Sequence, residues 1–179
     1  MDHKDHVDLL RPADLSQGGT WADFGAGSGA FTLAMSELVG INAEIYAIDR
    51  DKSALARLEQ SHRARFGTSQ NIHTMRADFT GALSLPPLDG ILMANSLHYY
   101  RDKEKLLRHI RKYLKWNGAL LLVEYNVDSG NPWVPHPLSF ETFHSLAPRS
   151  GFSEPSLLAK APSRFLREFY SAITHRKES

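Results

Sequence analysis

The amino-acid sequence predicts a doubly wound, Rossmann-like α/β fold built on a largely parallel sheet. Apolar stretches of strand length alternate with segments of helical periodicity, and glycine or Asn-Gly signals end those helical segments. The last regular apolar stretch, "GALLLVEYN", is apolar on both faces, as in a strand that helices cover on each side. Strands that alternate with helices in this way are joined by right-handed crossovers and pair in parallel.

Five strands are expected in the first two thirds of the chain. Each is a short apolar segment bounded by turn or capping residues. The third is the most polar of the five, so we expect it near an edge of the sheet. The five segments lie at 19–25, 43–50, 71–78, 87–96 and 118–126.

Three helices are expected between these strands. The first carries apolar residues at helical spacing up to Gly40, and Asp51 can cap the second. Asp102 can cap the third, which has apolar residues from Leu106 to Leu114 on one face and Asn117-Gly118 at its end.

The last fifty residues are less regular. Ser139 can cap a short helix that Pro148 and Gly151 end, and a strand is expected at 153–163. The segment 165–176, "FLREFYSAITHR", is ambiguous. The spacing of its apolar residues favours a helix, whereas its aromatic and β-branched content suits a strand.

Length and composition indicate one globular domain over residues 1–179 that is predicted to be cytoplasmic. The chain has 42% hydrophobic residues and a formal net charge of +1, which gives no indication of nucleic acid or an acidic membrane as a partner. The absence of cysteine excludes disulfides, thiolate metal sites and cysteine nucleophiles. Neither a signal peptide nor an apolar stretch of membrane-spanning length is found in the sequence.

A glycine-rich turn follows the first strand in "TWADFGAGSGAF", residues 20–31. Gly25, Gly27 and Gly29 allow a sharp turn and a close approach of a ligand to the backbone, beside the positive end of a helix. Phosphates, nicotinamide dinucleotides and S-adenosylmethionine (SAM) all bind such turns, and Gly25, Gly27 and Ala30 even satisfy the relaxed G-x-G-x-x-A pattern. The turn alone therefore leaves the ligand open.

Polar residues at other strand ends narrow the choice. Asp49 ends the second strand, where a carboxylate can accept hydrogen bonds from both ribose hydroxyls of a nucleoside. Asp23, at the end of the first strand, suits a positively charged amine and would repel a pyrophosphate. Asp78 and Phe79 follow the third strand, where they can serve an adenine amino group and its ring, and Asn95 ends the fourth strand at the centre of the predicted crevice.

Several segments in succession resemble the motifs of class I SAM-dependent methyltransferases, and in particular the small-molecule branch with the ubiquinone/menaquinone-biosynthesis-like enzymes. They are "ADFGAGSGAF", "YAIDRD", "MRADF", "DGILMANSLHY" and "LKWNGALLLVEYN". The resemblance implies SAM as cofactor, S-adenosylhomocysteine (SAH) as product, and a seven-stranded sheet with an antiparallel C-terminal hairpin. On that basis we predict a strand in "FLREFYSAITHR", against its helical spacing.

The resemblance also implies a set of cofactor contacts. They are Gly25, Gly27 and Gly29 around the methionine part, Asp49 at the ribose, Asp78 and Phe79 at the adenine, the backbone of Asn95 at the amino-acid end, and Asp23 near the ammonium.

Methyl transfer requires mainly alignment of the acceptor and exclusion of water, with a base where the acceptor carries a proton. His98, just past the fourth strand, is the first candidate base, because histidine titrates near neutrality. Glu124, near the end of the fifth strand, is the second. Either side chain can instead have only a structural role.

The acceptor is expected to be a small molecule. Tyr99, Tyr100, Tyr125 and Trp133 can form an aromatic wall for a planar or cationic acceptor, or can simply cover the edge of the sheet. The Pro-rich segment 127–138 is a candidate lid. Only one short helix is expected before the first strand, so the site is open, closed by that segment, or completed by a second subunit in a homodimer.

Two other functions are compatible with the sequence. The first is an NAD-dependent oxidoreductase, which Asp23 and the lack of a separate substrate domain disfavour; Tyr99 and Lys103 match its Y-x-x-x-K spacing, but the T-G-x-x-x-G-x-G turn is missing. The second is a SAM-binding partner subunit without catalysis. Nucleic acid is not an expected partner, because the fourth strand lacks an N-P-P-[YF] motif, and His3 and His6 alone do not predict a metal site.

Overall fold

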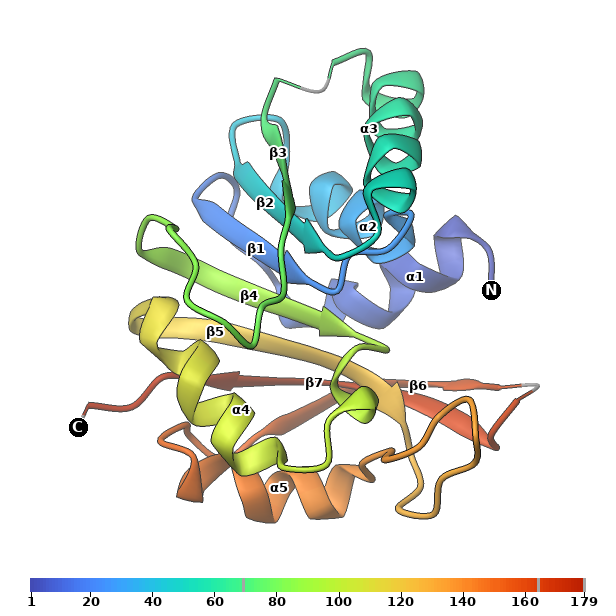
Figure 1. Cartoon of the computed structure of the whole chain (residues 1–179), viewed down its shortest axis with the longest axis vertical. Coiled ribbons are helices and arrows are strands. Elements are labelled where there is room, and N and C mark those ends of the chain that lie inside the picture. Colours follow the sequence, from blue (N-terminus) through green and yellow to red (C-terminus); the bar gives the residue numbers. More distant parts are fainter. Residues whose placement is uncertain (69, 164, 179) are drawn as a thin grey trace.

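The computed structural model of the protein describes residues 1–68, 70–163 and 165–178, which build a seven-stranded mixed sheet covered by helices (Figure 1). The strands lie in the order β3-β2-β1-β4-β5-β7-β6. Neighbours from β3 to β5 pair in parallel, and β7 runs antiparallel to both β5 and β6. The strands are β1 (Thr20–Phe24), β2 (Glu44–Asp49), β3 (Ile72–Arg76), β4 (Leu88–Ala94), β5 (Leu114–Tyr125), β6 (Ser156–Pro162) and β7 (Glu168–His175). This confirms the predicted fold class, including the polar third strand at an edge.

Helices cover both faces of the sheet. One face packs against α1 (His3–Leu10), α2 (Ala30–Val39) and α3 (Lys52–Phe66), and the other against α4 (Lys103–Ile110) and α5 (Phe140–Arg149) (Figure 1). The central strands β4 and β5 are therefore buried on both sides, as their continuous apolar sequences predict. Among the described residues, no helix combines the length and the apolar character needed to cross a bilayer.

The predicted caps begin their helices. Asp51 accepts hydrogen bonds from the backbone N–H groups of Ser53 and Ala54 at the start of α3, at 2.8 and 3.2 Å. Asp102 and Ser139 cap α4 and α5 in the same manner. Each cap satisfies backbone donors that the first turn of a helix leaves free, so a local signal determines where these helices begin.

The predicted end of the third helix is wrong. α4 ends at Ile110, a short 3₁₀ turn follows at Arg111–Tyr113, and Leu114 already belongs to β5, where it pairs with Leu88. Asn117-Gly118 lies inside β5, with Asn117 at a φ of +58°, where the register with β4 shifts. Strand pairing with β4 thus overrides the helical spacing of Leu114.

The segment "FLREFYSAITHR" contains β7, as the family resemblance implied and its helical spacing did not. β7 packs against α1 through Ser171 and against α5 through Tyr170, so residues on both of its faces are buried, from Phe169 to Ala172. Such a strand has no polar face and shows no alternation of apolar and polar residues. This explains why periodicity alone favours a helix here.

The N-terminal segment forms the single short helix that the sequence predicts. Asp2 caps α1, and the helix packs on α2, where His6 contacts the ring of Phe31 with centroids 4.6 Å apart. It is also tied to the C-terminal hairpin, because the Ser171 hydroxyl donates to the carbonyl of Leu9 at 2.6 Å. α1 therefore contributes to the core on the α2 face.

Candidate functional site

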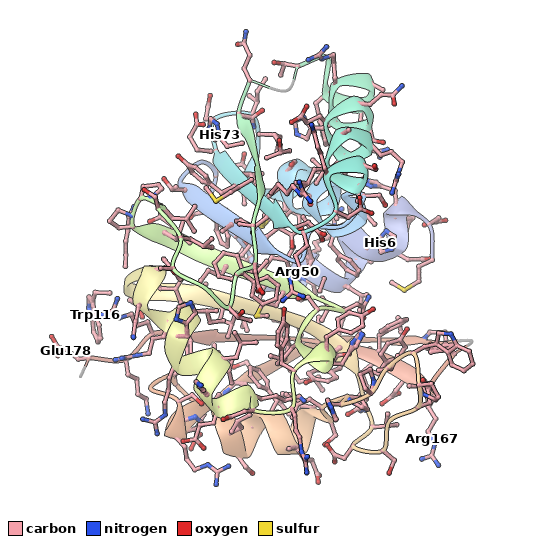
Figure 2. All side chains as sticks on the ribbon, in the orientation of Figure 1. His6, Arg50, His73, Trp116, Arg167 and Glu178 are labelled. Atoms are coloured by element: carbon pink, nitrogen blue, oxygen red, sulfur yellow. The ribbon has the colours of Figure 1, made fainter. Side chains whose placement is uncertain are left out.

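A cavity of about 310 Å³ opens where the carboxyl ends of β1, β2 and β4 meet. This is the point at which the strand order reverses between β1 and β4, and ligands of doubly wound folds bind at such points. Arg50, labelled in Figure 2, lies at this edge of the sheet. The lining residues are Gly25, Asp49, Arg50, Ala77, Phe79, Asn95, Ser96, Tyr99 and Tyr100. Four of them, Gly25, Asp49, Phe79 and Asn95, are predicted cofactor contacts.

The three glycines of the turn differ in what requires them. Gly25 has a φ of +87°, and a Cβ there would lie 2.5 Å from Cβ of Ser96. Gly29 has a φ of +91°, and its Cβ would meet Cγ of Leu58 at the same distance, so Gly29 is needed for the packing of α3. Gly27 faces open space, because a Cβ at this position would have no atom within 4 Å. Of the three, Gly25 is the one that lines the cavity.

Substitution of Gly29 by alanine is expected to lower the free energy of unfolding by about 2–4 kcal/mol, because it adds a clash with Leu58 to a left-handed backbone. Gly27→Ala is the matched control, since it adds backbone strain alone and costs about 1–2 kcal/mol. Urea unfolding of the two variants measures the difference. Equal losses of stability in the two variants would show that contact with Leu58 of α3 does not explain why glycine is needed at position 29.

Asp49 already organises the glycine turn. One carboxylate oxygen accepts from the N–H of Gly27 and the other from the N–H of Asp51, both at 2.8 Å. Each oxygen has two acceptor sites, so both can still accept from a ligand hydroxyl. Because Asp49 also lines the cavity, it connects the shape of the turn to the ligand space.

Asp78 is turned toward protein partners and does not line the described cavity. One of its oxygens accepts from the N–H and the hydroxyl of Thr80, at 2.9 and 2.7 Å, and the other pairs with Arg50. Burial alone would raise the pKa of Asp78, but these partners hold it below its ordinary value. Arg50 is among the residues that line the cavity, and Asp78 is not. Arg50 was not among the residues predicted from the sequence, although it directly follows Asp49.

Three buried polar atoms near the turn have no hydrogen-bond partner within the described part of the chain. They are Oδ1 of Asp23, Oδ1 of Asn95 and Oγ of Ser96. An unpaired buried polar atom costs about 1–3 kcal/mol, so such atoms are normally paired by protein, water or a ligand. Asn95 also has a φ of +54°, a strained conformation for a residue other than glycine. These three atoms lie at the carboxyl ends of the neighbouring strands β1 and β4, and together they indicate a site for a polar ligand.

Asp23 is the most deeply buried of the predicted ligand contacts. It is 1% exposed, and its second oxygen accepts from the hydroxyl of Thr32 at 2.6 Å. Burial raises the pKa of Asp23 to about 7, with the hydrogen bond from Thr32 acting in the opposite direction. The carboxyl therefore titrates near neutrality beside the glycine turn.

The two candidate bases form one buried pair. Nδ1 of His98 lies 2.9 and 3.0 Å from the two carboxylate oxygens of Glu124, and both side chains are almost fully buried. Glu124 also accepts from the N–H of His98 at 3.1 Å and from the N–H of Tyr125 at 2.8 Å. A carboxylate only accepts, so Nδ1 of His98 is the donor in this pair, and Nε2 is the ring nitrogen left for another partner.

The surroundings of this pair connect it to the cavity and to the Pro-rich segment. Tyr99, whose ring centroid is 4.3 Å from that of His98, lines the cavity. The N–H of His136 donates to the carbonyl of His98 at 3.0 Å, which fastens the segment 127–138 beside the pair. Lys103 is buried and donates to the carbonyl of Tyr100 at 2.9 Å, so it supports the backbone of this turn.

Comparison with known proteins gives consistent similarities. A family model described as "Methyltransferase domain" matches residues 22–120. The ubiquinone/menaquinone biosynthesis C-methyltransferase UbiE of Pasteurella multocida (strain Pm70) is 31% identical over 106 residues, which are 58% of this chain and 39% of that enzyme. The chain thus matches well under half of that relative's length.

Two solved structures share the fold at low sequence identity. The YcgJ protein of Bacillus subtilis has a TM-score of 0.78 at 15% identity, covering 99% of this chain and 100% of that one. The N-methyltransferase NodS of Bradyrhizobium japonicum WM9, solved in complex with SAH, has a TM-score of 0.74 at 18% identity, covering 98% of this chain and 87% of that one.

Proposed function

The chain belongs to the methyltransferase domain family whose model spans residues 22–120, and from this membership we propose that it transfers a methyl group from SAM to oxygen or nitrogen of a small molecule. One observation supports this function most. Gly25 of the glycine turn and Asp49 line the cavity at the β1–β4 switch point. Three buried polar atoms near this turn have no hydrogen-bond partner among the described residues.

The residues of this cavity, together with the buried carboxyl of Asp23 beside the glycine turn, fit SAM. Oδ1 of Asp23 is free to accept from the ligand ammonium, directly or through water, and Asp49 has acceptor sites left for two ribose hydroxyls. Phe79 and Tyr100, with ring centroids 5.3 Å apart, offer apolar surface for an adenine. Asn95 carries an unpaired amide oxygen for the amino-acid end.

SAM, when bound, would supply a methyl group on a sulfonium: the lone pair of the acceptor would form the new bond to the methyl carbon, and the electron pair of the broken carbon–sulfur bond would stay on sulfur, giving SAH. The protein's task is to align the acceptor and to remove its proton. Nε2 of His98 takes the proton of an acceptor O–H or N–H. Glu124 holds the opposite nitrogen, so it orients the ring and stabilises the positive charge that the ring gains.

The ionisation of Asp23 is expected to make SAH binding depend on pH. An ammonium ligand prefers the ionised carboxylate, so affinity for SAH falls about tenfold between pH 8 and pH 6 as Asp23, with its pKa of about 7, becomes protonated. Calorimetric titration across this range measures the effect. Asp23→Asn binds SAH weakly at both pH values and loses the dependence.

Without added ligand the same residue acts in the opposite direction. The pKa of Asp23 is raised by folding, from 3.8 to about 7, so its contribution to stability is complete below about pH 4 and is lost as the pH rises through about 7. The substitution Asp23→Asn is expected to remove this decline in stability, and urea unfolding across the pH range measures it. Affinity and stability that change with pH in the same direction would contradict the role of Asp23.

Calorimetry with SAM, SAH and NAD tests the cofactor, and release of SAH with phenols, amines and thiols tests the reaction. Binding of SAM and SAH but not NAD, together with SAH release, supports the proposal. Binding of NAD alone would indicate an oxidoreductase. Binding of SAH without turnover across the acceptors would indicate a SAM-binding subunit without catalysis.

A further inference from the structure

Exposed aromatic side chains gather beside the buried His98–Glu124 pair. Trp133 is 70% exposed, Tyr99 is 61% exposed and Phe165 is 49% exposed. They come from three separate parts of the chain: the turn after β4, the Pro-rich segment, and the turn between β6 and β7. A contiguous exposed apolar surface on a folded protein usually marks a binding site.

The rings form a continuous series. Trp133 contacts Phe165 edge to face, with centroids 6.1 Å apart, and Phe165 lies 6.1 Å from Tyr125. Tyr125 lies 5.9 Å from the ring of His98, which lies 4.3 Å from Tyr99. The series therefore begins at the cofactor cavity, which Tyr99 lines, and passes the candidate base before it reaches Trp133.

We propose that Tyr99, Tyr125, Trp133 and Phe165, here called the aromatic platform, bind the planar aromatic ring of the methyl acceptor and bring its hydroxyl to Nε2 of His98. This inference rests on the proposed methyltransferase function. It assigns the acceptor class to a surface that is continuous with the cofactor cavity. Aromatic rings attract one another beyond the effect of burying their area, so several ring faces favour a flat acceptor over a saturated one.

The buried pair beside the platform favours a phenolic acceptor. Nδ1 of His98 donates to Glu124, so Nε2 is left to take a proton from the acceptor. A phenol needs only a base for its single proton, and His98 supplies one.

Equilibrium binding in the presence of saturating SAH tests the platform without requiring turnover. The probes are 2-naphthol, its saturated counterpart decahydro-2-naphthol, and the cationic 1-naphthylmethylamine. We expect 2-naphthol to bind at least tenfold more tightly than the saturated alcohol, and more tightly than the amine. Trp133→Ala weakens its binding about tenfold, and Trp133→Phe restores most of the loss.

Trp116→Ala is the matched control, because Trp116 is likewise exposed, at 61%, but lies near the start of β5, whereas Tyr125 of the platform ends that strand. Naphthol affinity unchanged by Trp133→Ala, or lowered equally by Trp116→Ala, overturns the proposal. Equal binding of the saturated alcohol, or tighter binding of the amine, overturns the acceptor class. SAH affinity is measured on every variant and tests the methyltransferase function separately. If the unmodified protein did not bind SAH, the methyltransferase function itself would be refuted, and not the platform alone.

Discussion

Replacement of His98 by glutamine is expected to lower kcat for a hydroxyl acceptor by about 10²- to 10⁴-fold, which is the usual contribution of a positioned general base. Glutamine can still donate to Glu124 but cannot take a proton at neutral pH. Because the variant lacks a side chain that takes the acceptor proton, the pH dependence of its kcat is expected to differ from that of the unmodified protein. SAH affinity stays nearly constant, because His98 does not line the cofactor cavity. Steady-state kinetics from about pH 6 to pH 9, with calorimetry, measure both properties.

Two further variants separate catalysis from structure. Glu124→Gln keeps the shape of the pair but removes the charge that stabilises protonated His98, so kcat falls by about tenfold or more while the fold is retained. His73→Gln is the matched control, because His73 pairs with Glu44 at the exposed edge strand β3, far along the sheet from the site (Figure 2). Its activity is expected to be unchanged. A His98 variant with unchanged pH dependence, or with SAH affinity lost in parallel with kcat, would make His98 a structural residue only.

Much of the fold could be predicted because local signals determine it. Asp51, Asp102 and Ser139 each satisfy backbone donors of the helix that follows them, and this requires no knowledge of distant parts of the chain. The boundary between α4 and β5 depends instead on tertiary pairing. Leu114 fits a helical face in the sequence, but its pairing with Leu88 places it in a strand.

The positions of the site residues were predictable to a similar extent. Parallel strands bring their carboxyl ends to one edge, so Asp49, Phe79 and Asn95 could be placed around a single cavity from the sequence. The direction of each side chain could not. Asp78 turns to Thr80 and Arg50, and which of its neighbours reaches the cavity depends on those contacts.

The pairing of His98 with Glu124 follows from the adjacency of β4 and β5, since each residue lies at or just past the end of its strand. Both residues were predicted from the sequence, but as separate candidates. Phe165 was missed as a partner of Trp133, because its segment was predicted to be a strand, whereas Phe165 lies in the turn before β7. Its position became definite only with the β6–β7 turn.

Asp49→Ala is expected to weaken SAH binding by about a hundredfold or more while the protein remains folded. A hydrogen bond to a charged group contributes about 1.5–3 kcal/mol, and Asp49 can accept from two ribose hydroxyls. The same substitution frees the N–H of Gly27, so a weaker affinity alone does not separate a ribose contact from a disordered turn. Asp51→Ala is the matched control for the neighbouring carboxylate: it removes the cap of α3 and costs about 1 kcal/mol of stability, with SAH affinity retained.

A ligand that lacks the hydroxyl makes the distinction. The 2′-deoxy analogue of SAH loses about tenfold in affinity for the unmodified protein, because it forfeits one hydrogen bond to a carboxylate. In Asp49→Ala that hydrogen bond is already gone, so SAH and its deoxy analogue bind equally. The substitution Asp49→Ala and the removal of the 2′-hydroxyl therefore have non-additive effects on the binding free energy, and the size of this non-additivity measures the contact between Asp49 and the ribose. An equal penalty for the deoxy analogue in both proteins would show that Asp49 acts on the glycine turn and not on the ligand.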